Sequence, residues 1–280
     1  MSFYFLNMRQ KLIAMVYGLI CHGLFLCAAL LMFICLFTGF SGQLIPSFFH
    51  SNYFLNLFLL LQFPLFHSFL LTKPGRKILR WFYSDDYQGK LDTTVYATIA
   101  SAQLIFLFLF WTPSEVVLWV APEPLYYFLC IGYFLGWLML SISSIQAGFG
   151  VQTGSLGWIS LYKGVKVKFP DMPCSGLFKI IRHPIYFSFC VILWVSPYLT
   201  VDKVVVASLY SLYCFLAPLL KEKRFIKIYG DRFRNYQLQT PYFFPKIENT
   251  ATFQNKKQKT LILSLYRAPN KSHSILNQLL

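Results

Sequence analysis

Residues 12–37 read LIAMVYGLICHGLFLCAALLMFICLF, a run of 26 residues without a single Asp, Glu, Lys or Arg. About 20 apolar residues in a helix suffice to cross the hydrocarbon layer of a bilayer. The run is longer than the roughly 7–15 apolar residues of a secretory signal peptide, and no small-residue cleavage site follows it. Arg9 and Lys11 precede it directly. The stretch therefore predicts a retained membrane-spanning helix.

The chain as a whole has the composition of a membrane protein. Of its 280 residues, 56% are hydrophobic and 12% are charged, whereas a soluble domain carries about 25% charged residues. This composition excludes a water-soluble globule, a disordered chain and a disulfide-stapled secreted module. The seven cysteines contain no CxxC pair and lie mostly in apolar runs. We interpret them as small apolar side chains and expect no metal site.

Five further apolar segments follow the first, at residues 53–72, 93–111, 124–147, 184–200 and 203–220. Only a polar turn around Asp202 separates the last two, which predicts an antiparallel helical hairpin. Residues 116–120 are expected at the membrane interface. The glycine-rich residues 148–158 (GFGVQTGSLGW) are expected to form a flexible re-entrant loop, because a dinucleotide fingerprint needs a preceding strand. The predicted fold is an all-α, polytopic membrane helical bundle of about six hydrophobic segments.

The distribution of basic residues predicts the orientation of this bundle. Of the 25 Lys and Arg residues, 24 lie in residues 1–11, 73–92, 148–183 and 221–280, and the alternate loops contain only Lys203. The positive-inside rule then places both termini in the cytoplasm. The net charge of +15 is thus explained by the lipid bilayer as partner, and no nucleic acid is expected. The basic tail is either bound to anionic lipid head groups or simply solvated.

Polar side chains concentrate at the cytoplasmic ends of the last hairpin. Residues 182–186 read RHPIY, and a proline is favourable at the first position of a helix. Arg182 and His183 at a helix N-terminus attract an anionic group. Arms of about 17 and 18 residues, roughly 26 Å each, return Glu222 to the same end. The alternative is that Arg182 snorkels, Glu222 forms an interfacial ion pair and Tyr186 belongs to an aromatic belt.

Both halves of the hairpin also carry a family pattern. The segments RHPIY (182–186), EKRFIKIYGDRFRNY (222–236) and TPYFFP (240–245) follow one another in this order. The pattern resembles the isoprenylcysteine carboxyl methyltransferase family and its phospholipid-methyltransferase relatives. Residues 66–68 (FHS), 110–111 (FW) and 193–200 (LWVSPYLT) are similar to the methanethiol S-methyltransferase branch.

The resemblance implies a site for S-adenosyl-L-methionine (SAM) on the cytoplasmic side, without a metal. Glu222 matches one member of a paired-glutamate motif, and the other member is Lys221 in this sequence. The residues expected to bind the cofactor are Arg182, His183, Pro184, Ile185, Tyr186 and Glu222. Arg182 suits the carboxylate of SAM, Glu222 its ribose, and Tyr186 its sulfonium. No catalytic residue is assigned.

The predicted function is an integral membrane SAM-dependent methyltransferase acting on a small thiol or a lipid-linked, isoprenylcysteine-like acceptor that enters from the bilayer. Two alternatives stay open. Sterol and steroid reductases, which use NADPH, have a similar C-terminal architecture, and a non-catalytic scaffold or permease also has such helices. The lack of a charged residue in mid-span argues against a permease.

The same reading divides the chain into three parts. Residues 1–147 are N-terminal membrane helices, 148–246 the methyltransferase core, and 247–280 a basic C-terminal tail. The expected location is a bacterial inner membrane, with the endoplasmic reticulum as the alternative. Neither the acceptor nor the oligomeric state is defined by the sequence.

Overall fold

A computed structural model of the protein describes residues 2–41, 53–87 and 89–245. Residues up to Phe243 form one compact unit, and a second unit begins at Phe244. The predicted basic tail at 247–280 lies outside the described residues, and the boundary expected at residue 147 stays a prediction.

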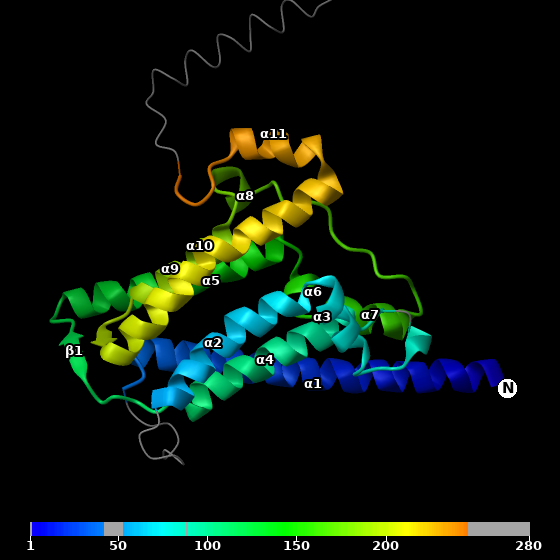
Figure 1. The fold of residues 1–280 in the computed structure, drawn as a ribbon, viewed down its shortest axis with the longest axis horizontal. Coiled ribbons are helices and arrows are strands. Elements are labelled where there is room, and N and C mark those ends of the chain that lie inside the picture. The colour runs from blue at the N-terminus through cyan, green and yellow to red at the C-terminus, as the bar shows by residue number, and fades with distance from the viewer. Residues whose placement is uncertain (1, 42–52, 88, 246–280) are drawn as a thin grey trace, which may run out of the picture. The chain divides into compact units, whose positions relative to one another are not determined.

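Long apolar helices dominate the first unit (Figure 1). Among the residues that the structure describes, four helices are long and apolar enough to cross a membrane, and a bent helix pair makes a fifth if it counts as one span. This confirms an all-α membrane bundle and identifies an integral membrane protein. The long helices are α1 (Ser2–Thr38), α2 (Tyr53–Leu70), α4 (Asp92–Phe110), α5 (Leu125–Gln146) and α10 (Val201–Tyr229).

The predicted span at residues 184–200 is wrong in its length. Helix α9 (Pro184–Trp194) has 11 residues, which is about 16 Å and too short for a hydrocarbon layer. The chain then forms strand β2 (Tyr198–Thr200), which pairs antiparallel with β1 (Val117–Val120), the segment expected at the interface. Figure 1 shows this ribbon at one end of the bundle and the N-terminus at the other. The hairpin therefore has unequal arms, since α10 has 29 residues.

The interior of the bundle is built by apolar side chains from several of these helices. Leu59 of α2, Leu107 of α4, Tyr133 of α5 and Ile192 of α9 are all buried in one cluster. These side chains fill the space between the helices, so the helices pack closely against one another. This cluster fixes α9 and α10 against the N-terminal helices.

A sharp bend follows α2. Helix α3 (Lys73–Arg80) is inclined at 94° to α2, and Thr72 caps it by accepting a hydrogen bond from the Gly75 N–H at 3.3 Å. A Cβ atom at Gly75 would lie 2.2 Å from the carbonyl oxygen of Phe69. Only glycine permits this approach. A single-turn 3-10 helix at Asp85–Tyr87 then leads to α4.

The glycine-rich segment after α5 is helical, so the expected flexible re-entrant loop is wrong. It forms α6 (Phe149–Gln152) and α7 (Ser155–Lys163). Gly154 has φ +78°, and a Cβ at Gly157 would lie 2.5 Å from Thr94 Oγ1. Buried Thr94 donates its hydroxyl to the Gly154 carbonyl at 2.7 Å. The glycines thus serve close packing of α7 on the start of α4.

Lys203, the one basic residue assigned to the alternate loops, lies in the first turn of α10 with its side chain fully buried (0% exposed). Its Nζ donates to the Leu36 carbonyl at 3.0 Å and to Ser196 Oγ. The neighbouring Asp202 accepts a hydrogen bond from Trp111 Nε1 at 3.0 Å. A lysine whose ammonium group is buried and hydrogen-bonded inside the protein does not indicate which side of the membrane its segment faces. Lys203 therefore need not follow the distribution of the other 24 basic residues.

Candidate functional site

Arg182 and His183 are held at the start of α9 by the proline that follows them. Pro184 opens the helix and His183 is its N-cap residue. Proline is favourable here because its missing N–H would have no partner inside the helix. The backbone N–H of Arg182 donates to the Pro241 carbonyl at 2.9 Å. The C-terminal segment therefore closes directly over the start of α9.

Helix α10 brings Glu222 to the same point. The helix continues past the predicted end at Leu220, so Glu222 is a helical residue and is buried (7% exposed). Its Oε1 accepts a hydrogen bond from Arg182 Nε at 2.8 Å and lies 2.8 Å from His183 Nε2. The structure therefore joins side chains 40 residues apart that were predicted to converge at this end of the hairpin.

The neutral form of His183 is favoured in this environment. Burial lowers the pKa of His183, while its hydrogen bond to Glu222 acts in the opposite direction. A neutral imidazole beside a carboxylate donates its Nε2–H to that carboxylate. His183 Nδ1 then carries a bare lone pair, and this buried atom has no hydrogen-bond partner among the described residues. Buried acceptors without partners are uncommon, so this nitrogen calls for a donor.

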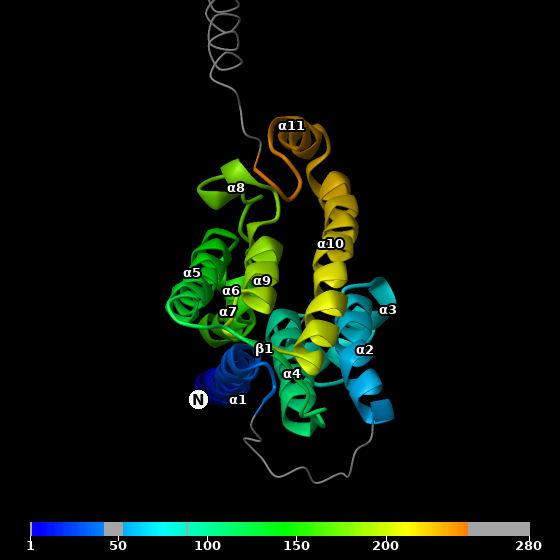
Figure 2. The ribbon, with the colours of Figure 1, turned by 90° about the vertical axis from the view of Figure 1, so that its left-hand side faces the viewer.

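A short C-terminal helix completes a group of side chains around Glu222. We call this group, formed by Arg182, His183, Glu222 and Gln237, the clamp. Gln237 of α11 (Asp231–Gln239) donates its side-chain amide to Glu222 Oε2 at 2.7 Å. Arg182 Nη1 donates to the carbonyls of Gln237 and Thr240, at 2.9 and 2.6 Å. In Figure 2, α11 lies near α8 (Leu177–Ile180) beyond the end of α9. Sequence reasoning missed Gln237, although it directly follows the quoted motif that ends at Tyr236.

Aromatic rings surround the cationic side of this clamp. The Tyr242 ring lies 4.8 Å from that of His183 and 5.4 Å from the Arg182 guanidinium. The Tyr186 ring lies 5.9 Å from His183. Burial, with Glu222 nearby, raises the pKa of Tyr242 to about 12, so this phenol is neutral. Neutral aromatic faces attract a cationic ligand.

Two of the expected site residues have apolar surroundings. Pro184 is almost fully buried, and Ile185 packs against the apolar interior cluster of the bundle. Their side chains offer shape and exclusion of water, and no polar group. Lys221, which occupies the position of the second family glutamate, lies 5.3 Å above the Phe225 ring. In the described part of the chain it forms no ion pair.

Several polar atoms of the clamp have unused hydrogen-bonding capacity. A carboxylate has about four acceptor positions, and Glu222 uses three of them for Arg182, His183 and Gln237. Arg182 Nη2 makes no hydrogen bond with the described residues. His183 Nδ1 is a bare acceptor for a hydroxyl or ammonium donor. These groups suit the polar groups of the cofactor that the sequence implied. Within residues 2–41, 53–87 and 89–245, no group of three or more His, Cys, Asp or Glu side chains could hold a metal ion.

The chain is similar in sequence to several curated proteins, and methyltransferases are among them. The chain is 26% identical to methanethiol S-methyltransferase 1 of Bradyrhizobium diazoefficiens over 192 residues, 68% of this chain and 66% of that protein. It is 25% identical to methanethiol S-methyltransferase of Crocosphaera subtropica over 257 residues, 85% of this chain and 94% of that protein. It is also 26% identical to Nurim of Rattus norvegicus over 179 residues, 60% of this chain and 66% of that protein.

No family model matches the chain, and no solved structure matches it. The relatives nevertheless confirm the resemblance indicated by the sequence motifs, to the isoprenylcysteine carboxyl methyltransferase-like family. Their names support a membrane methyltransferase.

Proposed function

We propose that this protein is an integral membrane SAM-dependent methyltransferase whose acceptor is a small thiol or a lipid-linked group. The observation that carries the proposal is the junction of Arg182, His183 and Glu222. Buried polar groups with unused hydrogen-bonding capacity, next to aromatic faces, suit a ligand that is both polar and cationic. The names of the relatives add methyl transfer as the reaction.

The side chains of the site would mainly bind, orient and exclude water. Arg182 Nη2 is available for a carboxylate, His183 Nδ1 for a hydroxyl or ammonium, and the last acceptor position of Glu222 for a ribose hydroxyl. When bound, SAM would supply a methyl group on a sulfonium sulfur for transfer to the acceptor. Such a transfer depends chiefly on alignment and on a dry site. The buried Pro184 and the partly buried Ile185 would help to keep the site dry.

We further propose that both termini and this site face the cytoplasm. The burial of Lys203 supports this orientation, because it removes the one basic residue assigned to the opposite face. Helix α3 is also basic, since it contains Lys73, Arg76, Lys77 and Arg80. SAM would reach such a site from the cytoplasm, and an apolar acceptor would reach it from the bilayer. A bacterial inner membrane is consistent with the bacterial methyltransferases among the relatives.

A non-catalytic role is the second candidate, because the clamp by itself is a structural joint. Glu222 is already bonded to three side chains, and Nurim is a relative whose name states no activity. The NADPH-dependent reductase alternative stays distinguishable by its cofactor.

The test is a calorimetric titration of the purified protein in detergent with SAM and, separately, with NADPH. We expect SAM to bind one per chain and NADPH not to compete. His183→Ala should weaken SAM binding about 10-fold or more, since a buried hydrogen bond is lost. Lys221→Glu, which recreates two adjacent glutamates, should keep or tighten SAM binding. Arg9→Ala is the control, since Arg9 is an exposed basic residue on α1, and should change nothing. Binding of NADPH without SAM would favour the reductase, and binding of neither would favour the non-catalytic role.

A further inference from the structure

Helix α3 turns away from α2 and has all of its charges on one side. It is inclined at 94° to α2, so an α2 that crosses the bilayer leaves α3 nearly parallel to the membrane surface. Positions i, i+3, i+4 and i+7 lie on one face of a helix, and in α3 they are Lys73, Arg76, Lys77 and Arg80. Another face packs on protein, since Gly75 and Leu79 are buried. Helix α3 therefore has the pattern of an amphipathic helix that lies in a membrane interface.

Neighbouring side chains do not neutralise the four cations of α3. All four are exposed, and none forms an ion pair within the part of the chain that the structure describes. The next acidic residues along the chain have other surroundings, since Asp86 accepts a hydrogen bond from Ser84 and Asp92 accepts one from Tyr83. Asp85 is exposed. Clustered cations at a membrane surface attract anionic lipid head groups.

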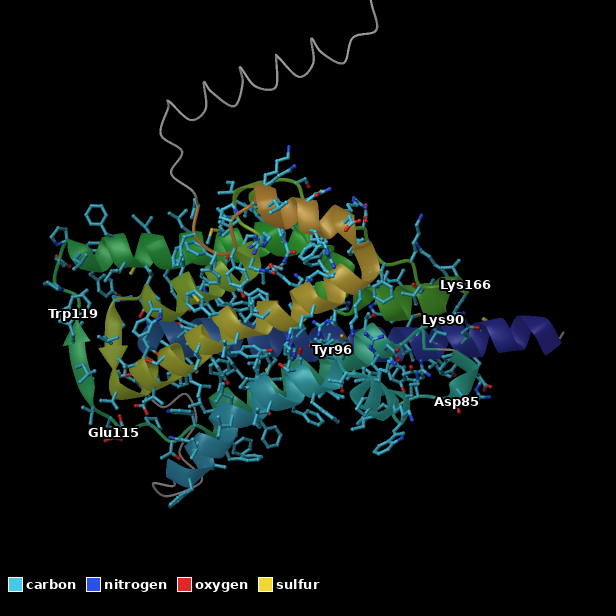
Figure 3. All side chains as sticks on the ribbon, turned by 45° about the horizontal axis from the view of Figure 1, so that its top comes forward. Asp85, Lys90, Tyr96, Glu115, Trp119 and Lys166 are labelled. Atoms are coloured by element: carbon cyan, nitrogen blue, oxygen red, sulfur yellow. The ribbon has the colours of Figure 1, made fainter. Side chains whose placement is uncertain are left out.

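Two aromatic residues follow α3 directly. Trp81 is 80% exposed and Phe82 is 54% exposed. Exposed aromatic side chains beside basic ones are typical of the boundary between lipid head groups and hydrocarbon. In Figure 3 the labelled Asp85 and Lys90, a few residues further along the chain, lie at the end of the bundle opposite to Trp119. The segment that contains α3 thus leads to one end of the membrane helices.

Phe82 also lines an apolar groove between α1 and α4. The groove has a volume of about 370 Å³, within the range of small-ligand pockets. Half-exposed Val16 and Ile20 form its wall on α1, and buried Val95 belongs to its wall on α4. The Tyr17 hydroxyl donates to the Phe82 carbonyl, which ties this wall to the chain after α3. Since α1 and α4 are both candidate membrane spans, an acyl chain of the bilayer fits such a groove.

Packing holds the cationic face and the groove in one arrangement. Leu79 of α3 belongs to the same buried cluster as Val95 of the groove, and Tyr17 and Ile99 pack against that cluster. A neutral lipid would fill the groove and gain nothing from the cations. A soluble anion would contact the cations and leave the groove empty. The ligand that uses both features has an anionic head and an apolar chain.

We propose that α3 and the adjacent groove form a binding site for an anionic phospholipid of the surrounding bilayer. Its phosphate contacts the cationic face of α3, and one acyl chain lies between α1 and α4. The bound lipid holds α3 at the membrane surface and supports the packing of α4 on α1. The site contains no residue of the clamp, so its test does not depend on the proposed methyltransferase function.

The experiment counts the lipids bound to the full chain by native mass spectrometry. Delipidated protein in detergent is titrated with phosphatidylglycerol and, separately, with phosphatidylcholine that has the same acyl chains. We expect the first phosphatidylglycerol to bind at a roughly 10-fold lower concentration, because several cations act on its charge. Replacing all four basic residues of α3 by Gln should abolish this preference. If that protein fails to fold, Arg76→Gln with Lys77→Gln should reduce the preference to roughly 3-fold.

Matched variants separate a site on α3 from general attraction to a basic protein. The control removes the same charge at four exposed lysines elsewhere and should keep the preference: Lys168, Lys179, Lys223 and Lys227, each replaced by Gln. Ile20→Trp narrows the groove and leaves α3 unchanged. It should weaken the binding of both lipids by a similar factor, because both have the same acyl chains.

Fluorescence locates the bound lipid. Phosphatidylglycerol with brominated acyl chains quenches the tryptophans that it contacts, and Trp81→Phe should remove part of this quenching. Equal binding of the two lipids to the parent would overturn the proposal, as would an equal loss of preference in the α3 variant and in the control. Displacement by glycerol 3-phosphate, which has no acyl chain, would assign the cations to a soluble anion. Unchanged binding in Ile20→Trp would refute the groove as the site of the acyl chain.

Discussion

Replacing Glu222 by Gln is the sharpest test of the clamp, because it removes one charge and keeps the size of the side chain. Glu222 Oε1 lies 2.8 Å from both Arg182 Nε and His183 Nε2, and Oε2 accepts from Gln237 Nε2 at 2.7 Å. An amide oxygen can still accept hydrogen bonds at one of the two positions. The amide nitrogen at the other position can only donate, so it faces an N–H group that previously donated to the carboxylate.

The magnitude follows from the number of bonds affected. A hydrogen bond to a charged group contributes about 1.5–3 kcal/mol and a neutral one about 1 kcal/mol. Two bonds at Oε1 lose their charge assistance, and Gln237 must rotate its side-chain amide to offer its oxygen to the new nitrogen. Arg182, whose side chain is 12% exposed, is left without a counter-ion. We expect a loss of about 3 kcal/mol in the free energy of unfolding.

The assay is equilibrium unfolding in mixed micelles, followed by tryptophan fluorescence. Glu123→Gln is the matched control, since Glu123 is exposed and accepts a hydrogen bond from the Tyr127 hydroxyl at 3.0 Å. It should change stability by less than about 0.5 kcal/mol. Glu222→Gln combined with His183→Ala should cost less than the sum of the two single changes, because both remove the same contact. Additive effects, or a Glu222→Gln protein as stable as the parent, would refute the clamp as a coupled unit.

Three further outcomes follow from the structure. Burial lowers the pKa of His183, so below about pH 6.5 the unfolded state binds its proton more readily than the folded state. Stability should therefore fall from pH 7.5 to pH 5, and His183→Gln should flatten this dependence in the same unfolding assay. Lys203→Ala should destabilise the protein by about 1–3 kcal/mol, since the Leu36 carbonyl loses its buried donor, whereas Lys227→Ala, at an exposed position of the last turn of α10, should be neutral. In a cysteine-free background, a cysteine at Val116 should react with an impermeant maleimide outside intact cells and one at Lys163 should not; the reverse pattern would invert the proposed orientation.

The sequence alone determined the class of fold, because membrane helices need only an apolar composition over a sufficient length. Residues 12–37 predicted the first span correctly, and α4, α5 and α10 followed from the same criterion. The convergence of Arg182 and Glu222 was predicted as well, although from two helical arms of nearly equal length. The structure brings the two side chains together with unequal arms, an 11-residue α9 followed by a strand and a 29-residue α10.

Tertiary structure decided the features that depend on contacts between distant segments. Composition could not distinguish the predicted arm 184–200 from a short helix with a strand, since both are apolar, and pairing with β1 decided it. Lys203 looked like a loop residue until the end of α1 supplied its acceptor. The hydrogen bond between His67 and Tyr96 depends on α2 ending where α4 passes. Hydropathy is a property of each segment by itself, whereas a hydrogen bond depends on which atom of another segment lies within 3 Å.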